Sequence, residues 1–161
     1  MSRPRGHYHP PNSPPSGIGY PPELYQVLSG TAHFLLQQKS LSDVVAVAAA
    51  AGGEFVMIPP GYGHVSINSG EEVLVMANLV STRFASEYAL YEELQGGAYY
   101  KMEGNGWVMN PRYPMVSSFR EMSARDAPGL GGIQHGMDMY DLVSGSADLS
   151  FLNEPEKIAD R

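Results

Sequence analysis

The chain has 161 residues and a formal net charge of −7, a length that suits one domain with a single hydrophobic core. The acidic balance and the lack of a basic stretch argue against partners such as nucleic acid or an anionic membrane. No apolar run reaches the ~20 residues of a membrane span, and the first residues lack the apolar segment of a signal peptide, so a cytoplasmic protein is expected.

The composition favours strands and turns over a helical bundle, with 18 Gly, 13 Pro and 10 Tyr. There is no cysteine, so any bound metal must be held by nitrogen and oxygen ligands.

The first part of the chain reads as a loop followed by strands. Residues 10–22 are rich in proline and predict an irregular loop. Residues 23–28 and 31–38 have strand-like sequences on either side of Ser29 and Gly30, and we predict that they form a hairpin. The segment DVVAVAAAAGGEF contains both helix-favouring alanines and strand-favouring valines, and we interpret it as a strand.

The remaining elements follow from alternation and turn residues. Three strands are predicted within residues 54–80 and one short helix near residues 85–94. A second hairpin is predicted around the turn Gly104-Asn105-Gly106. After Ser117 the sequence becomes loop-like and ends in an acidic segment. We therefore predict a barrel core over residues 1–116 and an extension over 117–161 that packs on it or is partly disordered.

Metal-ligating side chains gather near the start of the sequence. His7 and His9 are separated by one residue, so on a strand both imidazoles face the same side and can bind one ion. Glu23 adds a carboxylate on the next strand, and six residues separate it from Gly30, which lies at a tight turn.

A second motif lies further along the chain. Gly53, Pro59, Gly61, His64 and Asn68 have the spacing G(X)5PXG(X)2H(X)3N, which resembles the second motif of the cupin family. The glutamate followed by a glycine matches the end of the family's first motif, although the 13 residues after the histidine pair make a longer insertion than is usual there.

The resemblance implies an all-β cupin fold, a small antiparallel barrel of the jelly-roll type, here with a short helix and an irregular C-terminal tail. It also implies one divalent metal ion. Three imidazoles and one carboxylate suit Fe²⁺, which we expect first, as well as Mn²⁺, Ni²⁺ or Zn²⁺, and leave two octahedral positions open. The implied ligands are His7, His9, Glu23 and His64. The other histidines have ordinary interpretations: His33 as a pocket or core residue, His135 as an exposed one.

Longer segments of the sequence resemble one particular group within the cupin family. Four segments together are similar to the cupin-type glucose-6-phosphate isomerases of archaea and some bacteria. They are GHYH, PELYQVLSGTAHFLLQ, IPPGYGHVSINSGEEVLVMANLVS and SEYALYEELQGGAYY. The segment YDLVSGSADLSFLNEP resembles the tail of longer bacterial members. The activity implied is the interconversion of glucose 6-phosphate and fructose 6-phosphate in glycolysis and gluconeogenesis.

The resemblance also implies roles for individual residues. The metal would hold the C1 and C2 oxygens and stabilise an enediolate as a Lewis acid. Glu23 would move the proton between the two carbons, with a metal-assisted hydride shift as the competing mechanism, and Tyr25 would orient the sugar. Gly6, Tyr88 and Ser86 would contact the phosphate, Ser86 standing where family members often have a histidine.

Three expectations concern the chain as a whole. Five residues precede Gly6, whereas family members have several strands before the histidine pair, so we expect a barrel that is incomplete at its N-terminus. Arg3 and Arg5 are expected to be solvated, with a contribution of charge to the phosphate site as the alternative. A homodimer is expected. Two alternatives to the isomerase remain: a non-catalytic metal- or sugar-binding cupin, and a non-haem iron dioxygenase on the same barrel.

Overall fold

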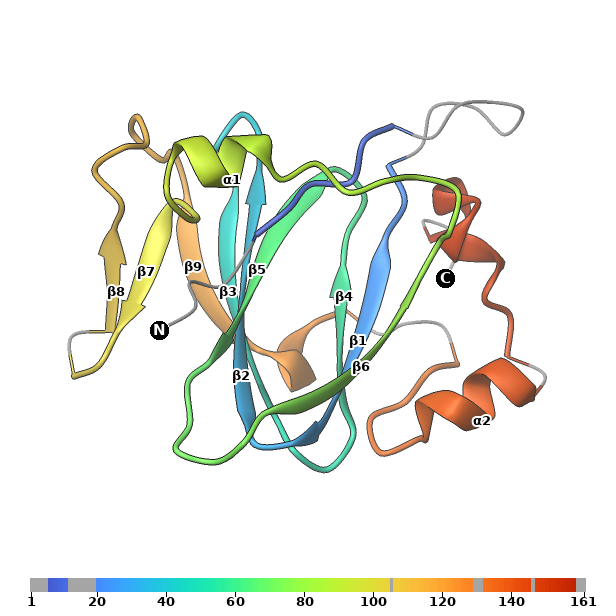
Figure 1. Cartoon of the computed structure of the whole chain (residues 1–161). Coiled ribbons are helices and arrows are strands. Elements are labelled where there is room, and N and C mark those ends of the chain that lie inside the picture. The colour runs from blue at the N-terminus through green and yellow to red at the C-terminus, as the bar shows by residue number, and fades with distance from the viewer. Residues whose placement is uncertain (1–5, 12–19, 105, 129–131, 146, 159–161) are drawn as a thin grey trace.

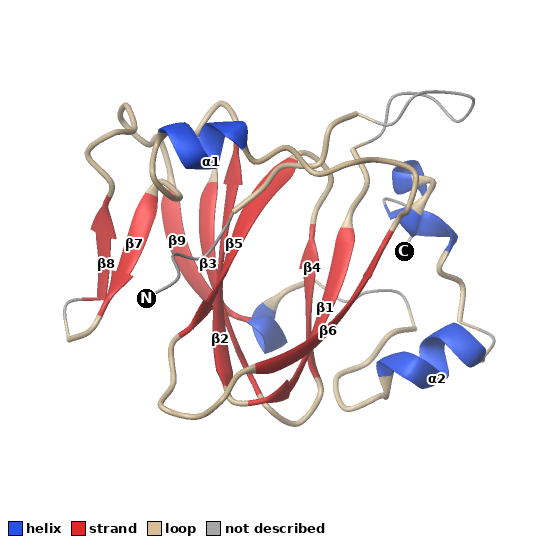
Figure 2. Ribbon diagram, in the orientation of Figure 1, coloured by secondary structure: helices blue, strands red, loops and turns tan. Residues whose placement is uncertain are grey.

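The computed structural model describes residues 6–11, 20–104, 106–128, 132–145 and 147–158. Two β-sheets face each other, with a small β-ribbon and α1 on one side and the C-terminal helices on the other (Figures 1 and 2). This arrangement confirms the predicted cupin-like all-β fold. The described strands do not close into a continuous barrel.

One sheet has three strands and the other has four. The three-stranded sheet has the order β4 (Glu54–Ile58), β1 (Glu23–Ser29) and β6 (Val75–Val80). The four-stranded sheet has the order β5 (Tyr62–Asn68), β2 (Thr31–Gln38), β3 (Val44–Ala50) and β9 (Phe119–Ser123). The separate ribbon pairs β7 (Tyr99–Met102) with β8 (Gly106–Met109).

The helices are short. The α-helices are α1 (Ala89–Glu93) and α2 (Met139–Ser144), and 3-10 turns cover Ala124–Asp126, Ser150–Leu152 and Pro155–Ile158. None of the helices in the described ranges is long and apolar enough to cross a membrane. The helix expected near residues 85–94 is confirmed as α1, and the second predicted hairpin is confirmed as the β7–β8 ribbon, whose turn residue Asn105 lies outside the described residues.

The first predicted hairpin is wrong, although both of its strands exist. β1 pairs with β4 and β6, whereas β2 pairs with β3 and β5. Gly30, at a φ of +78° that favours glycine, makes a turn between the two sheets rather than within one. Val27 of β1 and Phe34 of β2 are therefore both buried in the core between the sheets. Alternation along a strand does not specify which neighbour it pairs with.

The four-stranded sheet is buried on both faces. Phe34, Leu36 and Val47 point into the core between the two sheets. The alternate residues Leu35 and Val44 pack on the other face with residues of α1 and the β7–β8 ribbon. A strand covered on both faces reads as a continuous apolar run, which explains the sequence VVAVAAA of β3.

The expectation of loop structure after Ser117 is wrong at two places. β9 pairs in parallel with β3, and α2 follows with its N-cap Asp138 accepting a hydrogen bond from the Tyr140 backbone. Both elements are short, and their sequences lack the long periodic pattern that makes an element predictable. The division of the chain at residues 116 and 117 stays a prediction.

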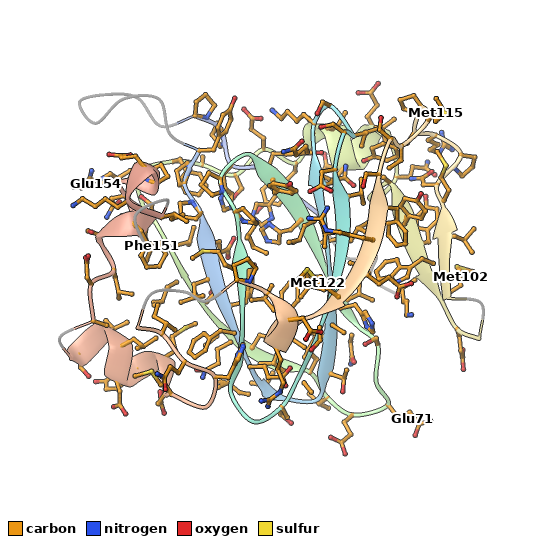
Figure 3. All side chains as sticks on the ribbon, turned by 180° about the vertical axis from the view of Figure 1, so that it is seen from behind. Glu71, Met102, Met115, Met122, Phe151 and Glu154 are labelled. Atoms are coloured by element: carbon orange, nitrogen blue, oxygen red, sulfur yellow. The ribbon has the colours of Figure 1, made fainter. Side chains whose placement is uncertain are left out.

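The C-terminal segment packs on the outer face of the three-stranded sheet. Leu24 and Phe55 on that face contact a cluster that includes Leu142, Phe151 and Leu152. Figure 3 labels Phe151 in the C-terminal segment. The side chain of Gln26 fastens the same segment, because its amide donates to the Met137 carbonyl and accepts from the Met139 backbone.

The packing of Phe151 can be tested by truncation. Phe151 is 1% exposed, so Phe151→Ala should lower the free energy of unfolding by about 3–5 kcal/mol, measured by urea denaturation. The matched control is Tyr140→Ala, an aromatic side chain of the same C-terminal segment that is 76% exposed. A loss no larger for Phe151→Ala than for Tyr140→Ala would mean that the segment does not stabilise the sheet.

Candidate metal centre

The N-terminal residues extend the four-stranded sheet along its β5 edge. His7 and His64 exchange two backbone hydrogen bonds of 3.1 and 3.0 Å, and Tyr8 and Glu87 exchange two of 2.9 and 2.8 Å. Tyr8 then points outward onto Tyr91. Because side chains alternate along an extended segment, His7 and His9 point the other way, into the space between the sheets.

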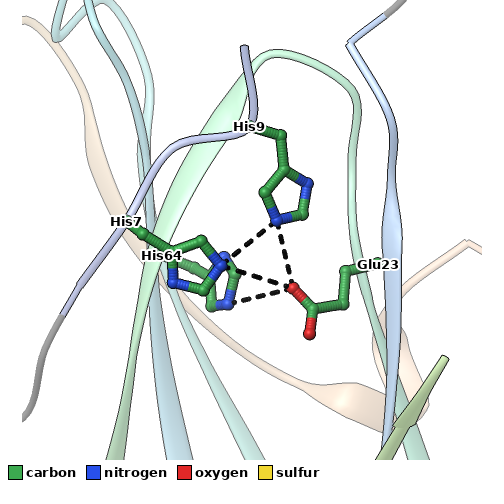
Figure 4. A group of neighbouring side chains, drawn as sticks. All are labelled: His7, His9, Glu23 and His64. Atoms are coloured by element: carbon green, nitrogen blue, oxygen red, sulfur yellow. Dashed lines mark hydrogen bonds and ion pairs between the residues drawn. The ribbon is translucent and has the colours of Figure 1, made fainter. Parts of the chain in front are cut away.

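Four metal-ligating side chains meet in this space (Figure 4). The Glu23 Oε2 atom lies 3.2 Å from His9 Nε2, 3.4 Å from His64 Nε2 and 3.6 Å from His7 Nε2. One ligand atom from each of the four residues lies within 4.8 Å of the others. The structure therefore brings together all four residues that the sequence predicts as ligands, and their role as ligands stays a prediction.

Neighbouring groups contact two of the imidazoles. His9 Nδ1 lies 2.7 Å from the carbonyl oxygen of Pro21, and since a carbonyl can only accept, this ring nitrogen is the donor. In the neutral form of the ring, Nε2 then carries the lone pair. A metal-binding histidine characteristically has such a partner. The Tyr25 hydroxyl lies 3.1 Å from His64 Nε2, on the side of the ring that faces Glu23.

The charges in the cluster suit a cation. Burial lowers the pKa of His64 to about 3, so its imidazole is neutral at pH 7. Burial acts to raise the pKa of Glu23, but the contacts with His7, His9 and His64 and a hydrogen bond from Asn78 lower it well below its ordinary value. The carboxylate is therefore ionised.

One oxygen of this carboxylate is left without a donor. Glu23 Oε2 is buried and has no hydrogen-bond partner among the described residues, although it lies close to three Nε2 atoms. A buried carboxylate oxygen without a hydrogen-bond donor is unfavourable unless a cation or donor compensates it. The three imidazoles and the single oxygen thus form a donor set that fits a divalent cation of the Fe²⁺, Mn²⁺, Ni²⁺ or Zn²⁺ type.

A cavity of about 250 Å³ opens next to the cluster. The predicted substrate residues Tyr25, Ser86 and Tyr88 line it, whereas Gly6 is not among its lining residues. Within the described ranges no lysine or arginine lines this cavity. The other lining residues are His7, His9, Glu23, Asn78, Val80, Ser81, Phe84. A larger cavity of about 590 Å³, near β3, β4 and β9, is mostly apolar and includes none of the four clustered residues.

Gly6 has a packing role in the structure. It is buried, and a Cβ atom there would lie 2.4 Å from the Tyr91 ring and 2.6 Å from the Val65 side chain. The absence of a side chain lets the N-terminal residues lie flat against β5. Whether the Gly6 backbone also contacts a phosphate stays a prediction.

The remaining histidines lie apart from the cluster. His33 is half-buried, with Nδ1 2.7 Å from the Ser69 hydroxyl. His135 is exposed, as predicted, and accepts a hydrogen bond from the Phe55 backbone. Arg3 and Arg5 lie outside the described residues.

Two neighbours of the cluster were not predicted. Asn78 donates to Glu23 Oε1 over 2.5 Å, and the Phe84 ring lies 4.5 Å from the His9 ring. Their positions depend on the pairing of β6 with β1 and on the path of the chain after β6, and neither is visible in a local sequence pattern.

The facing sheets and the inward cluster of three histidines and one glutamate define a cupin-like protein with a candidate metal centre. Residues 2–117 match the family model of glucose-6-phosphate isomerase (GPI). The chain therefore belongs to the cupin-type glucose-6-phosphate isomerase family. A search of curated proteins found no match.

The ligand role of His64 can be tested by removing its imidazole. His64→Ala should abolish metal retention, because it removes one of three nitrogens around a buried carboxylate. Metal content per chain after desalting, measured by inductively coupled plasma mass spectrometry, checks this. His33→Ala, which removes a histidine outside the cluster, should leave the stoichiometry unchanged. Equal metal content in His64→Ala and the wild type would show that the assignment is wrong.

The packing of Gly6 makes a separate prediction. Gly6→Ala should destabilise the protein by about 1–3 kcal/mol, the usual effect of overpacking, and should weaken metal binding because His7 shifts with the displaced backbone. Thermal unfolding and metal titration measure the two effects. Gly70→Ala is the control, since a Cβ there would lie 3.5 Å from Thr31, an ordinary contact. Unchanged stability in Gly6→Ala would contradict the close packing.

Proposed function

We propose that the protein is a metal-dependent aldose–ketose isomerase that interconverts glucose 6-phosphate and fructose 6-phosphate. Membership of the glucose-6-phosphate isomerase family gives an isomerase-type function at the level of the family. The observation that carries the finer proposal is the convergence of His7, His9, Glu23 and His64 on one centre. The first three of these residues also line the neighbouring cavity.

These four residues would hold the ion, with Fe²⁺ the first candidate and Mn²⁺, Ni²⁺ or Zn²⁺ as alternatives. A divalent cation there supplies Lewis-acid stabilisation of the negative charge that develops on the sugar oxygens during isomerisation. The neutral state of His64 and the ionised state of Glu23 support this assignment, because metal ligands must be deprotonated.

Two residues of β1 would act on the sugar itself. Glu23 would accept a proton from one carbon and return it to the next, as its carboxylate is ionised and lines the cavity. Burial and the neighbouring Glu23 carboxylate raise the pKa of Tyr25 far above its ordinary value. Tyr25 therefore stays a neutral phenol, which suits the orientation of sugar oxygens by hydrogen bonds. A hydride shift between the carbons is the alternative to proton transfer by Glu23.

The phosphate would be held mainly by neutral donors. Ser86 and Tyr88 line the cavity, and the Tyr88 ring lies 5.3 Å from the His7 ring. Hydroxyl groups satisfy phosphate oxygens by hydrogen bonds without adding charge beside a metal centre. A homodimer remains an expectation.

A coupled assay with fructose 6-phosphate tests the proposal. Protein loaded in turn with Fe²⁺, Mn²⁺, Ni²⁺ or Zn²⁺ should produce glucose 6-phosphate, and the stripped protein should not. In D₂O, deuterium from solvent should enter the product if Glu23 transfers a proton, whereas a hydride shift would leave the product unlabelled.

The outcomes separate the alternatives. Metal-loaded, folded protein that binds fructose 6-phosphate without turnover would indicate a non-catalytic cupin. Metal-dependent uptake of O₂ without isomerisation would indicate a dioxygenase. Either result would overturn the isomerase.

A further inference from the structure

Asn78 lies beside Glu23 because of the register between β1 and β6. In this antiparallel pair Tyr25 is opposite Asn78, and Glu23 is opposite Val80. Asn78 is therefore the diagonal neighbour of Glu23 on the same face of the sheet, within reach of a side chain of its length. Both residues line the cavity at the candidate metal centre. The Asn78 Nδ2 atom donates to Glu23 Oε1 over 2.5 Å.

The two oxygens of Glu23 have different surroundings as a result. Oε1 accepts the hydrogen bond from Asn78. Oε2 has no hydrogen-bond partner among the described residues and faces the Nε2 atoms of His7, His9 and His64 at 3.2 to 3.6 Å. Rotation of the carboxylate would exchange these surroundings, and the hydrogen bond to Asn78 opposes that rotation.

We propose that Asn78 is a positioning residue that makes Glu23 a single-oxygen ligand. It occupies Oε1 and holds Oε2 toward the three imidazoles. The inference rests on the proposed metal-dependent function. A carboxylate held in this way would take one coordination position on the ion instead of two. The second position would then be available to a sugar oxygen.

The chemistry of the amide suits this role. Asn78 supplies a donor without charge, so it does not repel a cation as a lysine or arginine at the same place would. Glu23 itself is 2% exposed, whereas Asn78 is exposed to the cavity. Replacement of Asn78 therefore removes the hydrogen bond without opening a hole in the core, and the variants should fold.

The test is metal binding by the whole chain after treatment with a chelator. Asn78→Leu keeps the size of the side chain and removes the donor, and Asn78→Ala removes both. Both variants should bind Co²⁺ about 10- to 100-fold more weakly than the wild type, the usual effect of losing a partner that orients a ligand. Asn78→Gln, which keeps an amide, should recover part of the loss. Isothermal titration calorimetry gives the dissociation constants.

A second readout reports the geometry. The visible absorption of bound Co²⁺ depends on the number of its ligands, so Asn78→Leu at saturating Co²⁺ should give a spectrum different from that of the wild type. A purely structural role for Asn78 would change thermal stability and leave this spectrum as it is. The matched control is Asn68→Ala, which removes an exposed strand asparagine that bonds to the Glu72 carbonyl and the Gly70 backbone, not to Glu23.

The outcomes distinguish this inference from the proposed function. Wild-type affinity and spectrum in both Asn78→Leu and Asn78→Ala would overturn the role of Asn78 and leave the isomerase untouched. Failure of the wild type to bind Co²⁺ would overturn both. Weakened binding in the variants together with a wild type that binds metal but does not isomerise fructose 6-phosphate would support Asn78 and overturn the isomerase.

Discussion

The buried carboxylate of Glu23 is the constraint on which the site depends. It lies between two apolar sheets, where an ionised group is stable only with compensating charge or hydrogen bonds. The protein satisfies one oxygen with an amide and surrounds the other with three imidazole nitrogens. Burial keeps His64 neutral, so that ring offers a lone pair to a cation. The buried negative charge needs a compensating cation, and the imidazole nitrogens can coordinate one. Both features therefore point to a bound cation.

The fold brings these groups around the Glu23 carboxylate because side chains alternate between the two faces of each strand. Leu24 faces the C-terminal helices and Glu23 faces the interior, just as Val65 faces the outer cluster and His64 the interior. Each sheet thus carries candidate ligands on its inner face, beside the core between the sheets, and packs a further apolar cluster on its outer face. The N-terminal segment follows the same rule, with Tyr8 outside and the two histidines inside. The apolar clusters on the outer faces fix the strands whose inner faces carry the site.

Much of the site was predictable because it depends on local spacing. The histidine pair needs an interval of one residue, and His64 belongs to a turn whose glycine and proline spacing is visible in the sequence. Pairing between distant strands was not predictable in the same way. Three features depend on which strands become neighbours. These are the placement of β1 and β2 in different sheets, the pairing of β9 with β3 and the contact of Asn78 with Glu23. Composition and alternation do not contain that information.

The pairing of His7 with His64 has a consequence for how the site assembles. The N-terminal segment is joined to β5 through two backbone hydrogen bonds at these residues, and the same two residues present nitrogens to the shared centre. An ion bound there would tie together parts of the chain that are far apart in sequence, and would act as a cross-link that reduces the conformational freedom of the unfolded chain. Docking of the N-terminal segment and binding of the ion would then be one coupled equilibrium, in which each step makes the other more favourable.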